Sequence, residues 1–180
     1  MKEFRMLRAD EIECRISTIN AKGLTLLLYK DARCDMNILD ETVGPLNWQR
    51  SHSRENANCT VSIWDDKKGT WVSKEDTGKE SYAEKEKGLA SDSFKRACFN
   101  WGIGRELYTA PFIWIPSDKC SIKDSGKKDK NGNSIKTCYD KFRVLQIIYD
   151  ENKKISALAI KNDSTGKTVF LFDNRKKDSK

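Results

Sequence analysis

The sequence is poor in the residues from which metal sites are usually built. It contains a single histidine, His52, among 180 residues. Its six cysteines are widely scattered and never form the CxxC or CxH pairs that are typical of zinc sites. Because zinc ligands normally cluster in sequence, we expect no structural metal ion, and in an intracellular chain we expect free thiols rather than disulfides.

Long apolar runs are also missing. No stretch of about 18 apolar residues occurs, and the first twenty residues alternate charged with hydrophobic side chains. Neither a membrane-spanning helix nor a signal peptide is therefore predicted. We expect a cytoplasmic protein without a membrane partner, and a length of 180 residues suits one domain with its own core.

The motifs of the common catalytic sites are absent as well. Gly102 and Gly104 follow a helical pattern instead of a strand, and Leu107 stands where a dinucleotide-binding fingerprint has its third glycine. There is no Walker A sequence, and His52 lies in a polar stretch with no nucleophile elbow near any serine. These absences predict a binding protein without a cofactor rather than an enzyme.

What the chain does have is positive charge near one end. The net charge of the chain is +7. Residues 111–180 contain 16 cations and nine anions, so this region alone also has a net charge of +7. A basic protein of this kind is typical of polyanion binding. A lysine-rich, solvated surface is the alternative explanation.

The first two thirds of the chain predict a helix, a β-meander and a second, longer helix. Asp31 is placed to cap a helix that Gly44 and Pro45 end. Period-2 alternation then predicts three antiparallel strands, the first of which carries Trp48, Arg50, His52 and Arg54 on one face. Ser81 and Glu84 form a capping box for the longer helix, whose apolar face contains Ala90, Phe94, Ala97 and Trp101.

The last third divides into a polar segment and three more strands. Residues 116–138 are rich in Lys, Ser, Gly and Asp and lack periodicity, which indicates a flexible loop. Strand patterns follow within 138–173 and predict a second meander. We therefore expect a single domain over 1–180, with a core of about 1–116, a flexible basic loop at 117–137, C-terminal strands at 138–173 and a basic tail at 174–180.

The end of the longer helix is the best candidate for a binding site. A glycine that ends the helix and a second glycine one residue later allow a tight reversal of the chain. This turn would present Arg105 and Tyr108 at the edge of a groove between helix and sheet. Cations and aromatic rings together suit single-stranded nucleic acid, and Arg50 on the basic face of the meander has the same character. A surface for a protein partner is the alternative.

The stretch "ASDSFKRACFNWGIGRELY", residues 90–108, resembles the signature of the Rad-fifty-two-type single-strand annealing proteins, in particular the phage-type (Sak-like) branch. In that family a Ser/Thr-Asp, a Lys-Arg-Ala and a Gly-x-Gly-Arg-x-Leu-Tyr turn recur in this order. Residues 29–49 and 71–81 resemble the family's upstream helix and first strand and its connection from hairpin to helix. The similarity spans about residues 29–116.

The resemblance implies an α+β fold, in which an antiparallel β-meander packs on a long helix as a β-β-β-α core, here with an additional C-terminal β-meander. It also implies oligomeric rings with a positively charged groove for single-stranded DNA, and no nucleotide hydrolysis. By position it assigns DNA contacts to Arg33, Lys95, Arg96 and Arg105.

The function that these observations predict is ATP-independent annealing of complementary DNA strands in homologous recombination and repair, by a homo-oligomer that binds single-stranded DNA. A strand protector or recombinase loader without annealing activity, and an adaptor for protein partners, are the alternatives. A single-strand binding protein or a recombinase would be a natural partner. The basic C-terminal region is a candidate for binding duplex DNA or the acidic tail of a partner.

Overall fold

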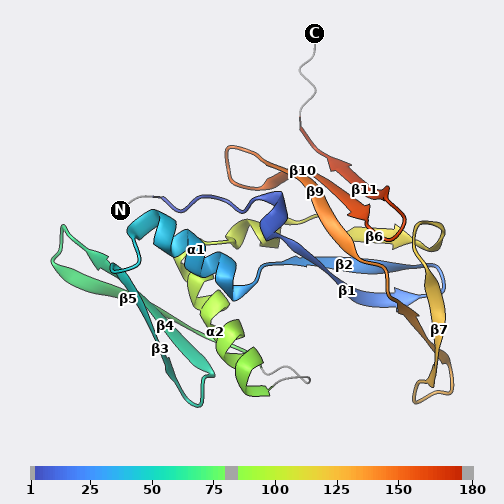
Figure 1. Cartoon of the computed structure of the whole chain (residues 1–180), viewed down its shortest axis with the longest axis horizontal. Coiled ribbons are helices and arrows are strands. Elements are labelled where there is room, and N and C mark those ends of the chain that lie inside the picture. The colour runs from blue at the N-terminus through green and yellow to red at the C-terminus, as the bar shows by residue number, and fades with distance from the viewer. Residues whose placement is uncertain (1–2, 80–84, 176–180) are drawn as a thin grey trace, which may run out of the picture. The chain divides into compact units, whose positions relative to one another are not determined.

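The computed structural model describes residues 3–79 and 85–175. Contacts within the chain divide it into two compact units. Unit 1 comprises Met1–Leu7 and Lys30–Arg105, and unit 2 comprises Arg8–Tyr29 and Glu106–Lys180. Figure 1 shows the elements of both units, each of which is described by itself below.

Unit 1 is built from one antiparallel sheet and two helices. The strand order is β3-β4-β5, and α2 packs on β4 and β5 (Figure 1). In the central strand Cys59, Val61 and Ile63 lie on one face and are buried, as period-2 alternation predicts, and Ser62 between them is buried as well. The elements are α1 (Ala32–Val43), β3 (Trp48–Ser53), β4 (Asn58–Asp65), β5 (Thr70–Thr77) and α2 (Lys85–Trp101).

The first helix begins and ends where its sequence signals predicted. The side chain of Asp31 accepts a hydrogen bond from the backbone N–H of Cys34 at 2.8 Å, which satisfies one of the free donors of the first turn. Gly44 follows the last turn with φ 87°, a conformation that favours glycine. Ile38 and Leu39 are fully buried and attach the helix to the core of unit 1.

Unit 2 contains a six-stranded sheet that is nearly closed. The strand order is β11-β10-β9-β1-β2-β6, and the two outer strands, β11 and β6, are in contact. β1 and β9 are joined at the pair Glu13 and Arg143, and a cleft of about 880 Å³ opens beside this junction. The strands are β1 (Glu13–Asn20), β2 (Gly23–Tyr29), β6 (Ile113–Pro116), β9 (Phe142–Tyr149), β10 (Ile155–Asn162) and β11 (Lys167–Asp173), with short 3-10 turns η1 (Ala9–Glu11), η2 (Arg105–Thr109) and η3 (Ser117–Lys119).

A separate two-stranded hairpin completes unit 2. It is formed by β7 (Ile122–Lys128) and β8 (Ser134–Cys138), which pair with each other and with no strand of the larger sheet in the described chain. The expectation of a loop at 116–138 was therefore wrong, because β7 and β8 are strands. The hairpin escaped prediction because nearly all its residues are polar, so no apolar alternation marks it.

The predicted fold class was also wrong. The chain is mostly β, with 46% of residues in strands and 22% helical, and its largest element is the nearly closed six-stranded sheet. It is not a β-β-β-α core packed on a long helix with a separate C-terminal meander. The three C-terminal strands do pair in sequence order, but β9 continues through β1 to β2 and β6. Local alternation identifies a strand without identifying its distant partner.

Two further expectations concern the helices. The predicted capping box of Ser81 and Glu84 lies outside the described residues. Within residues 3–79 and 85–175, no helix is long and apolar enough to cross a membrane.

Candidate nucleic-acid interface

Arg50 and Trp48 share one face of β3, as the alternation predicted, and this face lies toward Phe94 of α2. Its guanidinium carbon lies 4.6 Å from the centre of the Phe94 ring, and Trp48 stacks on the same ring with centroids 6.1 Å apart. Phe94 is fully buried, whereas Arg50 is exposed and makes no ion pair with the residues that the structure describes. A guanidinium that stacks through its face keeps the N–H donors of its edge for a ligand.

Arg105 caps the C-terminal end of α2. Gly102 and Gly104, with φ 96° and 73°, reverse the chain after the helix. The Nε and Nη2 atoms of Arg105 then donate to the carbonyl oxygen of Phe99 at 3.1 and 2.7 Å, and Nη2 also donates to that of Asn100 at 3.2 Å. The last carbonyls of a helix lack partners within it and carry the negative end of its dipole, so they favour a cation.

Lys74 reaches the same place from β5. Its Nζ donates to the carbonyl oxygen of Asn100 at 2.7 Å and lies 4.6 Å from the centre of the Trp101 ring. Lys74 and Arg105 thus share one acceptor and lie side by side. Neither cation has a carboxylate partner among the described residues, and the partial negative charge of one helix end balances only part of two positive charges. This Lys74–Arg105 pair is the strongest candidate for a phosphate site.

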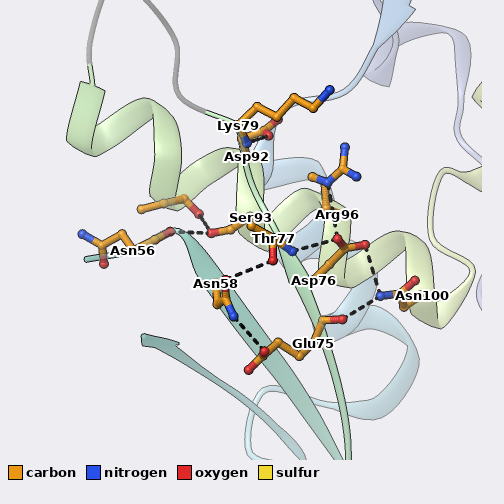
Figure 2. Close-up of polar contacts among 11 residues, drawn as sticks. Asn56, Asn58, Glu75, Asp76, Thr77, Lys79, Asp92, Ser93, Arg96 and Asn100 are labelled. Carbon is orange, nitrogen blue, oxygen red and sulfur yellow. Dashed lines mark hydrogen bonds and ion pairs between the residues drawn. The ribbon is translucent and has the colours of Figure 1, made fainter. Parts of the chain in front are cut away.

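Arg96 differs because it belongs to a polar seam between α2 and β5, which Figure 2 shows. Its Nε lies 3.4 Å from Oδ1 of Asp76, whose other oxygen accepts from Nδ2 of Asn100 at 3.3 Å. The same Nδ2 donates to the carbonyl of Glu75 at 3.0 Å. Arg96 therefore holds the helix on the sheet, and its charge is largely balanced by Asp76.

A buried ion pair lies under the turn that ends α2. Lys30 and Asp35 are 1% and 0% exposed, and Nζ of Lys30 donates to Oδ1 of Asp35. Nζ also lies 4.5 Å from the centre of the Phe99 ring. Burial raises the pKa of Asp35 to about 6, against the opposing effects of Lys30 and Lys95. In the described part of the chain, Oδ2 of Asp35 has no hydrogen-bond partner.

The buried lysine explains the second glycine of the turn. A Cβ atom built on Gly104 would collide with Cδ and Cε of Lys30. Gly102 has no such neighbour, and its side-chain position is open. Position 104 therefore requires glycine for two reasons: its φ is positive, and the side chain of Lys30 passes where a Cβ atom would lie.

The remaining predicted site residues lie elsewhere. Arg33 is 84% exposed at the start of α1, where its Nε is 3.0 Å from Oδ2 of Asp31. Since the other oxygen of Asp31 caps the helix, a carboxylate already occupies this N-terminus. Tyr108 is 70% exposed in η2 and belongs to unit 2, whereas Arg105 belongs to unit 1. The structure thus gathers Arg50, Lys95, Arg96 and Arg105 on or beside α2, and does not describe Arg105 and Tyr108 as one site.

Sequence reasoning missed Lys74, Asn100 and the Lys30–Asp35 pair. The position of Lys74 could have been predicted from the sequence. Val72, Lys74 and Asp76 alternate along β5 and pair with Ile63, Val61 and Cys59 of β4, which places Lys74 on the face of the sheet that is buried. The role of Asn100 had no signal in the sequence, since its backbone carbonyl is what binds the cations.

In the described ranges, no group of three or more His, Cys, Asp or Glu residues gathers as a metal site would require. Comparison of the chain with protein-family models, with curated proteins and with solved structures finds no match.

Proposed function

We propose that this protein binds single-stranded DNA and promotes the annealing of complementary strands without ATP, in recombination or repair. The observation that carries the proposal is the Lys74–Arg105 pair, in which two cations share the carbonyl oxygen of Asn100 without a carboxylate partner in the described chain. Two fixed positive charges that are only partly balanced by the helix end suit a phosphodiester backbone, whose neutralisation dominates nucleic-acid affinity.

Single strands differ from duplexes in that their bases are exposed and can stack on aromatic rings. The half-buried ring of Trp48 lies beside the exposed guanidinium of Arg50, which has no ion pair among the described residues, and the fully buried ring of Phe94 supports both from beneath. The resemblance of residues 90–108 to the Rad-fifty-two-type annealing proteins points to the same ligand.

Annealing of this kind needs no catalytic residue. It needs the repulsion between two phosphate backbones to be reduced while the bases stay accessible for pairing. A homo-oligomer would repeat weak phosphate contacts along one strand, so that the small contribution of each subunit adds up.

The test is annealing of two labelled complementary oligonucleotides, with and without the protein, across a salt series and without ATP. The variants are Lys74→Gln and Arg50→Gln, with Lys67→Gln in the β4–β5 turn as the control that removes the same charge elsewhere in unit 1. Arg105 is avoided because its loss would also uncap α2. We expect each interface variant to weaken single-strand binding about 3- to 10-fold and to reduce the salt slope by about 0.7 per lost phosphate contact.

Each outcome has a separate meaning. Tight binding without faster annealing would leave a strand protector or a recombinase loader. Variants that behave like Lys67→Gln would show that the interface is not the DNA site. No effect of nucleic acid at any salt concentration would indicate an adaptor for protein partners.

A further inference from the structure

The β7–β8 hairpin of unit 2 concentrates positive charge on a narrow ribbon. Residues 122–138 contain five lysines and two aspartates, a net charge of +3. Most residues of the hairpin are exposed, and the two strands form a sheet of their own. A two-stranded hairpin is only marginally stable by itself, and repulsion among its lysines does not stabilise it further, so the charge calls for another explanation.

Both aspartates of the hairpin are engaged by local partners. Asp124 accepts from Oγ of Ser134 at 2.5 Å and from Nζ of Lys136 at 2.6 Å. Asp129 accepts from the backbone N–H groups of Asn131 and Asn133 at 2.8 and 2.9 Å, and from Nδ2 of Asn133 at 3.1 Å. These hydrogen bonds lower the pKa of both carboxyl groups, so both are ionised and satisfied at neutral pH.

The other lysines are left without partners. The Nζ atoms make no ion pair or hydrogen bond with any residue that the structure describes, in contrast to that of Lys136. They lie along the first strand and at the tip, where like charges repel one another unless an anion intervenes. These lysines are Lys123, Lys127, Lys128 and Lys130.

The shape and composition of the hairpin favour one kind of polyanion. A two-stranded β-ribbon fits the major groove of a nucleic-acid duplex, and lysines along it can reach the phosphates on either side. Residues 119–138 contain no Phe, Trp or Tyr. Single strands, which bind largely through stacking on aromatic rings, are therefore the poorer fit. Lysine is a point charge without the bidentate geometry of arginine, so binding would be independent of base sequence.

We propose that the β7–β8 hairpin is a second nucleic-acid site, which binds the phosphates of a duplex. It goes beyond the function proposed above, because it lies in unit 2 and takes a different ligand. Its residues do not overlap with the Lys74–Arg105 pair or with Arg50.

The test compares two variants of the whole chain that each lose four positive charges. The hairpin variant carries Lys123→Gln, Lys127→Gln, Lys128→Gln and Lys130→Gln. The control variant carries Lys22→Gln, Lys141→Gln, Lys154→Gln and Lys167→Gln, all exposed lysines of unit 2. Binding of a short labelled duplex is measured by fluorescence anisotropy across a salt series around about 0.15 M.

We expect the hairpin variant to bind duplex at least tenfold more weakly than the control variant, with a salt slope smaller by about 2 to 4. Equal loss in the two variants would overturn the proposal, because the charge would then act without regard to its position. Binding of polyglutamate, a model of an acidic protein segment, is measured for the same two variants. If the hairpin variant loses binding to polyglutamate and keeps its binding to duplex, the proposal is overturned and an acidic protein partner is indicated.

Two readouts separate this proposal from the first. The hairpin variant should keep single-strand binding, whereas Lys74→Gln and Arg50→Gln should weaken it and leave the hairpin's contribution to duplex binding intact. The hairpin variant should also unfold at the same denaturant concentration as the wild type, since exposed unpaired lysines contribute little to stability.

Discussion

The cations of unit 1 and those of the β7–β8 hairpin in unit 2 are held in opposite ways. Lys30, Lys74 and Arg105 each have fixed acceptors and either lie against an aromatic ring or cap a helix. The hairpin's lysines, apart from Lys136, have no acceptor in the described chain. We call a cation with fixed acceptors held and one without them free. A held cation loses little further side-chain entropy when it binds a ligand. A free lysine loses more, but it adapts to different positions of the ligand.

This difference separates stability from binding. Removing a held cation, or its counterion, disturbs the fold as well as any site, and a binding assay on such a variant must be accompanied by a stability measurement. Removing a hairpin lysine should change binding alone. Four of the five tryptophans lie in unit 1, so their fluorescence reports mainly on that unit during unfolding.

The largest expected effect comes from removing the cation that is paired with the buried carboxylate of Asp35. Lys30→Met leaves that carboxylate buried without its charged partner, so we expect the free energy of unfolding at pH 7 to fall by about 3 to 5 kcal/mol. The measurement is denaturant unfolding of unit 1 followed by tryptophan fluorescence.

The double variant Lys30→Met and Asp35→Leu is the control for this substitution. It removes both charges and keeps an apolar chain over Phe99, so its stability should be close to that of the wild type. If the double variant is as unstable as Lys30→Met, the loss comes from packing, and the contrast between held and free cations is weaker than we describe.

A smaller effect is expected from pH. The pKa of Asp35 is raised from 3.8 to about 6, chiefly by burial, so folding takes up a proton between these values. The contribution of this group to stability is therefore fully present below about pH 4 and is lost as pH rises through 6, by up to about 3 kcal/mol. The measurement is the difference in unfolding free energy between the wild type and the double variant from pH 4 to 7. We expect the wild type to lose stability relative to the double variant as pH rises. If the wild type gains stability instead, Lys30 outweighs burial and the pKa of Asp35 is lowered.

Local signals in the sequence were sufficient for several elements of unit 1. Asp31 and Gly44 mark the ends of α1, and the alternation of Cys59, Val61 and Ile63 marks the buried face of β4, because caps and period-2 patterns depend on near neighbours in the chain. The six-stranded sheet could not be predicted in this way. Its central junction joins Glu13 to Arg143, and no local pattern connects residues so far apart.

The sequence singled out the end of α2 as a candidate site, but it did not predict the contacts that are found there. Arg105 was expected at the edge of a groove, and the structure shows that its guanidinium turns back to the carbonyls of Phe99 and Asn100. Sequence patterns predict contacts between side chains, whereas the acceptors here are backbone carbonyl oxygens at the end of a helix. For the same reason the partnership of Lys74 with Arg105 has no sequence signature.

The smallest effect concerns the two glycines of the turn, which make a matched pair. Gly104→Ala and Gly102→Ala both place a Cβ at positive φ, which costs about 1 to 2 kcal/mol. Only at 104 does the new atom also meet the chain of Lys30, and crowding of a packed interior costs about 1 to 3 kcal/mol more. We expect Gly104→Ala to be the less stable variant by that margin in tryptophan-monitored unfolding. Combining it with Lys30→Met and Asp35→Leu should retain the penalty, because methionine occupies nearly the same space as the lysine chain. Equal costs at the two positions would mean that Lys30 moves aside without loss, and that it is held by its charge and not by its packing.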